Sequence, residues 1–283
     1  MPTAKGLLNK FTTAKTLPYI TIQLTKLISN ENSTMKDFGN MIKMDPTLVL
    51  RILRSANSPY YGLRQKVNSI SRAIVIIGIN NLRNMIVTEG LKEIFKDKKG
   101  KNAFSRNRLW LHCAAVSICS QMIAERIFGF NGEDAFLCGI LHDIGMIVED
   151  QTAPDLFYEA CNSYDENSKL ITDHEKEIIG TDHCEIGYLL AKEWQLPIEV
   201  QEGIQHHHET LDHVAPSSLT GVIQQAEYIV SQLDYTAIPG MKAVLSLPLA
   251  KHIRNNVKEY KALVRDLPNE MSKAKDLYEP HEE

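Results

Sequence analysis

Apolar residues recur at the spacing of an α-helix along almost the whole chain, and this periodicity limits the fold more than any other feature. One such segment follows Ser105, with apolar side chains and one histidine at Leu109, His112, Val116, Cys119, Ile123 and Ile127. Alternating patterns typical of half-buried strands are sparse, and proline and glycine mostly punctuate the periodic segments. With 283 residues, 43% of them hydrophobic, the chain can bury one large core or two modest ones. The sequence therefore predicts an all-α protein built as a multi-helix bundle.

A charged, glycine-containing stretch at residues 96–102 (KDKKGKN) separates two groups of periodic segments. This composition is typical of a connector, so we expect a subdomain boundary there. The expected parts are an N-terminal arm, an N-terminal helical subdomain, a second helical subdomain, and a helical C-terminal extension with a charged tail, at residues 1–16, 17–100, 101–235 and 236–283.

Charge is distributed unevenly, although the net charge is only −4. Residues 36–83 contain eight Lys or Arg against two Asp, whereas residues 133–234 contain 21 Asp or Glu against three Lys. The second stretch also holds seven of the ten histidines. An acidic, histidine-rich segment favours a cation and repels nucleic acid, although a merely acidic surface is the commoner meaning of such a composition.

The five cysteines are odd in number, widely spaced and without a CxxC pair. This pattern argues against a disulfide framework and favours free thiols buried on helices. No apolar run approaches the ~20 residues that cross a bilayer, and the N-terminus does not resemble a signal peptide. We therefore expect a cytoplasmic protein that does not engage a membrane.

The adjacent pair His142-Asp143 is the centre of the expected chemistry. On one helix its side chains would lie about 100° apart and could reach a single ion. His112 lies on the preceding long helix, and the short Asn131-Gly132 turn favours antiparallel packing that lets His112 face His142. Imidazole and carboxylate groups are common ligands of zinc, iron and manganese. Later residues that can complete such a site are His183, His206, His207, His208 and Glu227.

The string around this pair, residues 135–145 (AFLCGILHDIG), resembles the HD superfamily of metal-dependent phosphohydrolases. The whole layout is similar to one of its branches, the HDOD (HD-related output domain) family. The resemblance covers about residues 17–235, most of the chain, and its matching strings include residues 180–187 (GTDHCEIG), 45–48 (DPTL), 56–62 (ANSPYYG) and 69–74 (SISRAI). Within these strings, Asn57, Tyr60 and Tyr61 are expected to be structural, closing the turn after a helix.

The resemblance implies an HD-like helical bundle with an N-terminal helical subdomain, found in bacterial signalling proteins that usually lack demonstrated catalysis. Its HD-GYP relatives are metal-dependent cyclic di-GMP phosphodiesterases. Transferred to this chain, their metal ligands would be His112, His142, Asp143 and Glu227, with His183, His207 and His208 on a second ion or a phosphate. A divalent transition metal, iron, manganese or zinc, is the implied cofactor.

The chain departs from the HD-GYP pattern in three places. Met146 stands where those enzymes carry a lysine, no Gly-Tyr-Pro follows Glu209, and Glu227 replaces an aspartate. Methionine can supply neither a charge nor a hydrogen-bond donor to a phosphoryl group, whereas glutamate can still coordinate a metal. The metal site can therefore survive while the catalytic apparatus is partly lost; if the chain is active, Asp143 would act with a metal-bound water.

Three functions remain open from the sequence. The first is a regulatory protein that binds a signalling partner or a small ligand. The second is a metal-dependent phosphohydrolase acting on a nucleotide or a cyclic dinucleotide. The third is DNA binding through residues 35–56, which have a helix-turn-helix rhythm, with Arg51 and Arg54 as the candidate contacts. We disfavour the third because the second helix of that segment is apolar almost all round, which is typical of a buried helix.

Overall fold

A computed structural model shows only helices among the residues that it describes, which are 2–11, 27, 33–43, 46–57, 61, 63, 65–92, 94–95, 104–164 and 169–273. This confirms the all-α prediction. The helices are α1 (Ala4–Lys10), α3 (Met35–Ile42), α4 (Pro46–Ala56), α5 (Ile70–Ile77), α6 (Ile79–Lys92), α7 (Arg106–Ile123), the π-helical turn η2 (Ala124–Phe128), α8 (Glu133–Leu141), α9 (Ile144–Thr152), α10 (Pro154–Ser163), α11 (Ile171–Ile178), α12 (His183–Glu193), α13 (Ile198–His206), α14 (Leu219–Gln232), α15 (Leu247–Asn255) and α16 (Val257–Lys273).

The chain divides into two compact units, which are described separately here. The larger unit comprises residues 1–13 and 94–278, and the smaller one comprises residues 14–93 and 279–283. The N-terminal helix α1 therefore belongs with the C-terminal part of the chain, whereas the sequence pattern suggested a separate arm. The expected connector at residues 96–102 falls outside the described residues.

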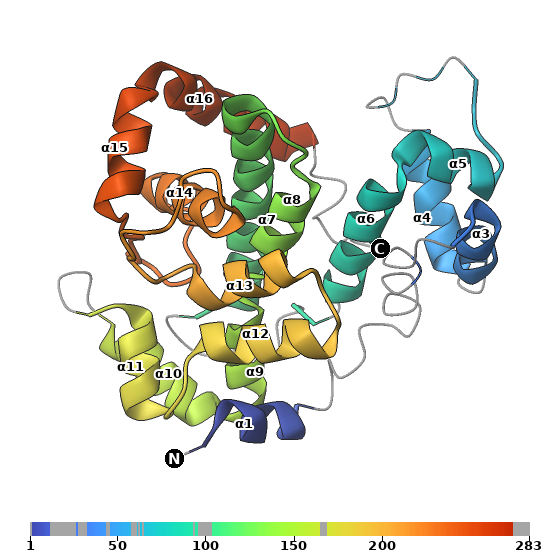
Figure 1. The fold of residues 1–283 in the computed structure, drawn as a ribbon. Helices are drawn as coiled ribbons and strands as arrows, with labels where there is room; N and C mark the ends of the chain where they lie inside the picture. The colour runs from blue at the N-terminus through green and yellow to red at the C-terminus, as the bar shows by residue number, and fades with distance from the viewer. Residues whose placement is uncertain are drawn as a thin grey trace. The chain divides into compact units, whose positions relative to one another are not determined.

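The smaller unit is built from α3, α4, α5 and α6 (Figure 1). A capping box begins α3, because the Thr34 side chain accepts from the Asp37 amide and the Asp37 side chain accepts from the Thr34 amide. The buried face of α4 presents Leu48, Ile52 and Ala56 to a core shared with α3 and α5. The helix is apolar almost all round but is buried on one side only, because Leu50 is 65% exposed.

Asn57 closes the turn after α4, as expected from the sequence. Its amide nitrogen donates to the Leu53 and Val67 carbonyls at 2.7 and 2.8 Å, and its oxygen accepts from the Val67 amide at 2.7 Å. One side chain thus joins the end of α4 to the stretch before α5. Tyr60 lies outside the described residues.

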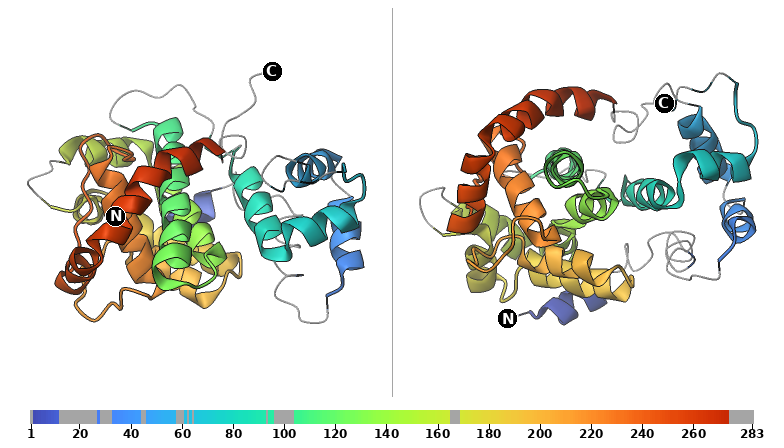
Figure 2. Two further views of the ribbon diagram at one scale, coloured as in Figure 1. Left: turned by 90° about the horizontal axis from the view of Figure 1, so that it is seen from above. Right: turned by 45° about the horizontal axis from the view of Figure 1, so that its top comes forward.

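In the larger unit, α7 runs through the centre and packs against α8, α14 and α16 (Figures 1 and 2). Helices α9, α12 and α13 pack beside them, and α1 lies on α12 and α9. Buried Leu7, Leu8 and Phe11 hold α1 in that position. Gly129, with φ of 73°, ends the α7–η2 segment in the left-handed conformation and allows the chain to turn back into α8.

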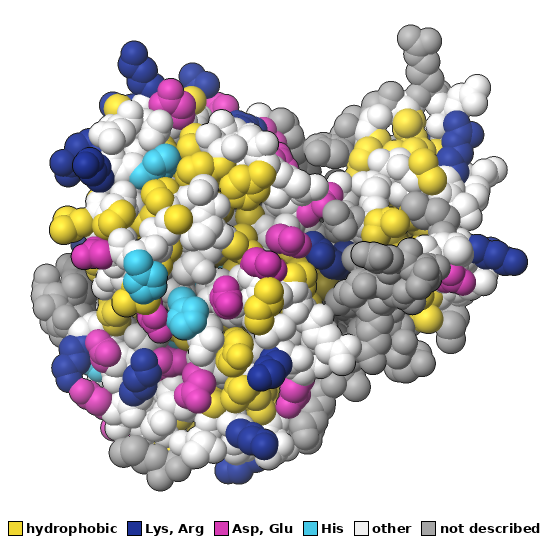
Figure 3. All heavy atoms as spheres, viewed as in Figure 1, with side chains coloured by type: hydrophobic (Ala, Val, Ile, Leu, Met, Phe, Trp, Pro, Cys, Tyr) yellow, Lys and Arg dark blue, Asp and Glu magenta, His cyan; other side chains and the backbone are white. Residues whose placement is uncertain are grey.

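No single helix among the described residues has both the length and the apolar composition needed to cross a bilayer; Ile70–Ile77 and Asn81–Thr88 meet that test only together, as a pair bent by 105°. Acidic and basic side chains are interspersed on the face of the larger unit seen in Figure 3. Part of the acidic excess of residues 133–234 is in the interior, at Asp143, Glu149, Asp150, Glu175, Asp182 and Glu227.

Replacing Asn57 with alanine should lower the free energy of unfolding of the smaller unit by about 1–3 kcal/mol, because three hydrogen bonds are lost and the Val67 backbone groups lose their partner. Calorimetry of the full chain measures the change. Asn81→Ala is the control, since Asn81 donates one bond, to Ile77, at 3.0 Å and should cost less. Equal effects of the two substitutions would contradict the role given to Asn57.

Candidate metal centre

His142 and Asp143 lie in a break between two helices. Helix α8 ends at Leu141, and Asp143, with φ of −99° and ψ of 12°, precedes α9. The expectation that both residues lie within one helix is therefore wrong. The break places Asp143 between the end of α8 and the start of α9.

The first half-site consists of His112 from α7, His142, Glu227 from α14, and oxygen Oδ2 of Asp143. The Nε2 atoms of His112 and His142 are 3.2 Å apart, and each lies 3.3 Å from Asp143 Oδ2. Glu227 Oε1 lies 2.8 Å from His112 Nε2 and 2.7 Å from His142 Nε2. The structure thus brings together all four residues that the sequence proposed as ligands of one ion.

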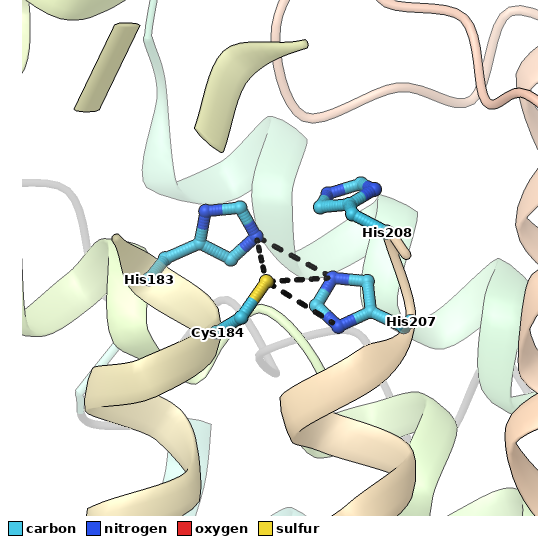
Figure 4. A group of neighbouring side chains, drawn as sticks. All are labelled: His183, Cys184, His207 and His208. Atoms are coloured by element: carbon cyan, nitrogen blue, oxygen red, sulfur yellow. Dashed lines mark hydrogen bonds between the residues drawn. The ribbon is translucent and has the colours of Figure 1, made fainter. Parts of the chain in front are cut away.

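The second half-site faces the other oxygen of the same carboxylate. Asp143 Oδ1 lies 3.3 Å from Nε2 of both His183, the first residue of α12, and His207, which follows α13. These two nitrogens are 3.4 Å apart. Cys184 and His208 border the half-site, as Figure 4 shows. His206 is not part of it, because its side chain is partly exposed and pairs with Glu209.

The hydrogen-bond partner of each Nδ1 atom fixes which of the two ring nitrogens carries the proton. Three Nδ1 atoms lie 2.7–2.8 Å from backbone carbonyl oxygens: His112 from Tyr235, His142 from Gly139, and His207 from Ile204. The fourth, Nδ1 of His183, lies 2.7 Å from Glu175 Oε2. A carbonyl or carboxylate oxygen can only accept, so Nδ1 donates in every case and the neutral ring turns its Nε2 lone pair inward.

With all four rings neutral, four inward lone pairs and two carboxylates therefore converge without a donor between them. Both oxygens of Asp143 are buried and accept no hydrogen bond of acceptable geometry among the described residues. A buried carboxylate left in this state is costly, and a divalent cation would satisfy all the groups at once. The residues present fit iron, manganese or zinc, which bind imidazole nitrogen and carboxylate oxygen.

The electrostatics of the metal-free centre favour a positive charge in it. Burial alone would lower the pKa of His112, but the charges of Glu227 and Asp143, and the hydrogen bond to Glu227, outweigh it and raise that pKa to about 10. The same carboxylates raise the pKa of His142 against the effect of burial. Protons and a metal ion thus compete for the same Nε2 atoms.

A second layer of acidic groups holds His183. Glu175 Oε2 accepts from both the backbone amide of His183, at 3.0 Å, and its Nδ1. Glu149 lies close to Glu175, and its buried oxygens have no hydrogen-bond partner among the described residues. Burial, and then the charge of Glu175, raise the pKa of Glu149, so its neutral form is favoured. Neither glutamate could be expected at the site from the sequence, because nothing in their spacing distinguishes them from surface acids.

Gly145 allows the two half-sites to meet. A Cβ atom at this position would lie 2.0 Å from the His183 carbonyl oxygen. The absence of a side chain is therefore what lets the start of α9, which follows Asp143, touch the start of α12, which carries His183. The glycine of the HDIG string is needed here for packing between helices.

The match to known families agrees with this geometry. Residues 14–210, more than half of the chain, match the HDOD domain. The chain belongs to the HDOD family. Residues 14–93 of the smaller unit and most of the centre lie within the matched residues, whereas Glu227, the last member of the first half-site, lies beyond them.

Three solved structures share the fold. An HDOD domain protein of unknown function from Geobacter sulfurreducens has a TM-score of 0.72 at 24% identity and covers 96% of this chain and 97% of its own. An inferred signal transduction protein from Marinobacter aquaeolei VT8 has a TM-score of 0.72 at 20% identity, over 93% of this chain and 60% of its own. An inferred phosphohydrolase from Shewanella amazonensis SB2B has a TM-score of 0.66 at 25% identity, over 95% and 93%.

An uncharacterized protein of Treponema pallidum (strain Nichols) is 26% identical over 199 residues. The match covers 68% of this chain but only 37% of that relative, so the chain spans little more than a third of its length.

Gly145→Ala should destabilise the larger unit by about 1–3 kcal/mol and weaken metal binding, because the new methyl group must push α9 and α12 apart. Thermal melting with and without metal measures both effects. Gly39→Ala is the matched control: a Cβ there meets only Ser71 Oγ, at 3.7 Å, so alanine should be neutral or stabilising in α3. If Gly145→Ala behaves like this control, the packing argument is wrong.

Proposed function

We propose that this HDOD protein is a signalling protein whose larger unit binds one or two divalent transition-metal ions, and that it acts by binding a partner protein or a small ligand. The observation that carries the metal proposal is the arrangement around Asp143. Each of its oxygens faces a pair of imidazole nitrogens at 3.3 Å, and each of those nitrogens has its lone pair turned inward. Such a donor set is preorganised for a metal.

Met146 favours binding over hydrolysis. It lies in the first turn of α9, three residues after Asp143, and its side chain is fully buried. Hydrolysis of a phosphate ester needs positive charge or donors on the phosphoryl oxygens, and a thioether offers neither. The similarity to an inferred signal transduction protein in fold is consistent with a regulatory role.

A phosphohydrolase is the second candidate, because Asp143 has the bridging position that a two-metal centre needs. When bound, two ions held this way would polarise a phosphoryl oxygen and lower the pKa of water. The residues of this chain would then hold and orient the centre, with Glu175 fixing the ring of His183. The inferred phosphohydrolase of similar fold supports this candidate, for which the substrate would be a nucleotide or a cyclic dinucleotide.

Asp143→Asn should lower metal affinity at least about 100-fold, because it removes the carboxylate shared by both half-sites, and even outer partners of metal ligands contribute about 10–100-fold. Elemental analysis and calorimetric titration of the full chain measure this. Asp173→Asn is the control, since Asp173 caps α11 and takes no part in the centre. Equal metal content of wild type and Asp143→Asn would refute the metal proposal.

The same metal-loaded chain decides between binding and hydrolysis. In excess over a panel of nucleotides and cyclic dinucleotides, it should form no product within a single turnover. Product that appears with the wild type and is absent with Asp143→Asn would replace the binding proposal with the phosphohydrolase.

Metal affinity should rise with pH, because binding displaces protons from rings such as His112, whose pKa is raised from 6.5 to about 10. The folding stability of the metal-free chain should change with pH in the opposite direction. Protonated His112 stabilises the fold fully below pH 6.5, and this contribution is lost as pH rises towards 10. The melting temperature of chelator-treated and metal-loaded protein, measured across this pH range, tests both trends. Glu227→Gln should make both pH dependences weaker. An affinity independent of pH would contradict the competition.

A further inference from the structure

Cys184 borders the second half-site and has no role in the function proposed above. It is the second residue of α12 and is 5% exposed. Its Sγ lies 3.5 Å from His183 Nε2 and 3.8 and 3.9 Å from Nδ1 and Nε2 of His207. Figure 4 shows the sulfur between the two rings. All five cysteines are buried. Among the described residues, Cys184 is the cysteine that lies in a group of side chains able to hold a metal ion, with His183, His207 and His208.

We propose that Cys184 is a ligand of the ion in the second half-site, together with His183 and His207, and that its thiolate makes this half-site selective for zinc. The inference rests on the proposed metal centre and adds to it the identity of one ligand and one metal. The first half-site, with two nitrogens and two oxygens, stays open to iron, manganese or zinc.

The distances match the edges of a tetrahedral zinc site. Zinc binds imidazole nitrogen at about 2.05 Å and thiolate sulfur at about 2.3 Å, so a regular tetrahedron has N–N edges of about 3.3 Å and N–S edges of about 3.6 Å. The edge from His183 Nε2 to His207 Nε2 is 3.4 Å, and the edges from Cys184 Sγ to these atoms are 3.5 and 3.9 Å. Asp143 Oδ1, 3.3 Å from both nitrogens, has the spacing of a fourth ligand.

Hydrogen bonding among neutral rings and a neutral thiol does not account for the arrangement equally well. A thiol has one proton, which could reach the lone pair of His183 or that of His207, and the other would stay unmet. Asp143 Oδ1 would also remain without a hydrogen bond, and it is buried. One cation would meet the sulfur and both nitrogens together, and Asp143 Oδ1 lies beside the same two nitrogens.

The thiolate gives the two half-sites different preferences. Thiolate sulfur favours zinc, whereas a carboxylate-rich set accepts manganese. A serine at position 184 has nearly the same size but a harder donor, so Cys184→Ser should reduce the preference for zinc over manganese at least about tenfold, given that even outer partners of ligands contribute about 10–100-fold.

Cobalt(II) titration of the full chain, made metal-free under anaerobic conditions, tests the inference directly. Cobalt reports any bound site by its visible d–d bands and reports a thiolate ligand by a separate sulfur-to-cobalt charge-transfer band in the near ultraviolet. We expect both sets of bands in the wild type. Cys184→Ser should lose the charge-transfer band and keep visible bands from the first half-site.

Cys113→Ser is the matched control, because Cys113 is equally buried and follows His112, a ligand of the other half-site. It should keep the charge-transfer band. Visible bands without a charge-transfer band in the wild type, or a band that survives in Cys184→Ser, would overturn the role of Cys184 and leave the metal centre intact. A chain that binds no cobalt, zinc or manganese would overturn the centre itself.

X-ray absorption on the zinc-loaded wild type needs no variant and so does not depend on how Cys184→Ser folds. The inference requires a sulfur at about 2.3 Å from zinc. A shell of nitrogen and oxygen alone would overturn it.

Discussion

The carboxylate of Asp143 is buried between two pairs of histidines, and most of the larger unit is arranged around this position. An uncompensated buried carboxylate is costly, so the surrounding helices must supply either protons or ligands for a cation. They come from distant parts of the sequence: α7 brings His112, α12 brings His183, and α14 brings Glu227. The break between α8 and α9 and the close approach at Gly145 are the two backbone features that make the position reachable.

Contacts that follow from the packing of two helices could be predicted from the sequence. Contacts that depend on a local break in a helix could not. The facing of His112 and His142 was predicted from a short turn between two helices, and their Nε2 atoms are 3.2 Å apart. The break at His142-Asp143 was missed because it lies in an apolar run without proline. Cys184 was correctly expected to be buried, but the pattern of cysteines carries no information about the rings of His183 and His207 on either side of its sulfur.

Charge was the other feature that the sequence described only in part. The acidic excess of residues 133–234 suggested a cation-binding segment, yet a count cannot separate interior acids from surface acids. Asp143 and Glu227 face the centre directly, and Glu175 stands one layer behind it. Arg106 neutralises Asp150 in a buried pair and so removes one acid from any role at the centre. The useful part of the charge pattern is therefore the part that is hidden from solvent.

A centre of this kind would act as a cross-link as well as a binding site. Its ligands come from α7, the α8–α9 break, α12, the end of α13 and α14, so an ion would tie together helices that otherwise meet through apolar contacts. At a metal concentration of 100 times Kd, binding to the folded chain adds about 2.7 kcal/mol to its stability. Helix α1 packs on α9 and α12, two of the elements joined in this way, and the chain passes from α1 into the smaller unit. Metal occupancy would thus strengthen the packing that holds α1 on the larger unit.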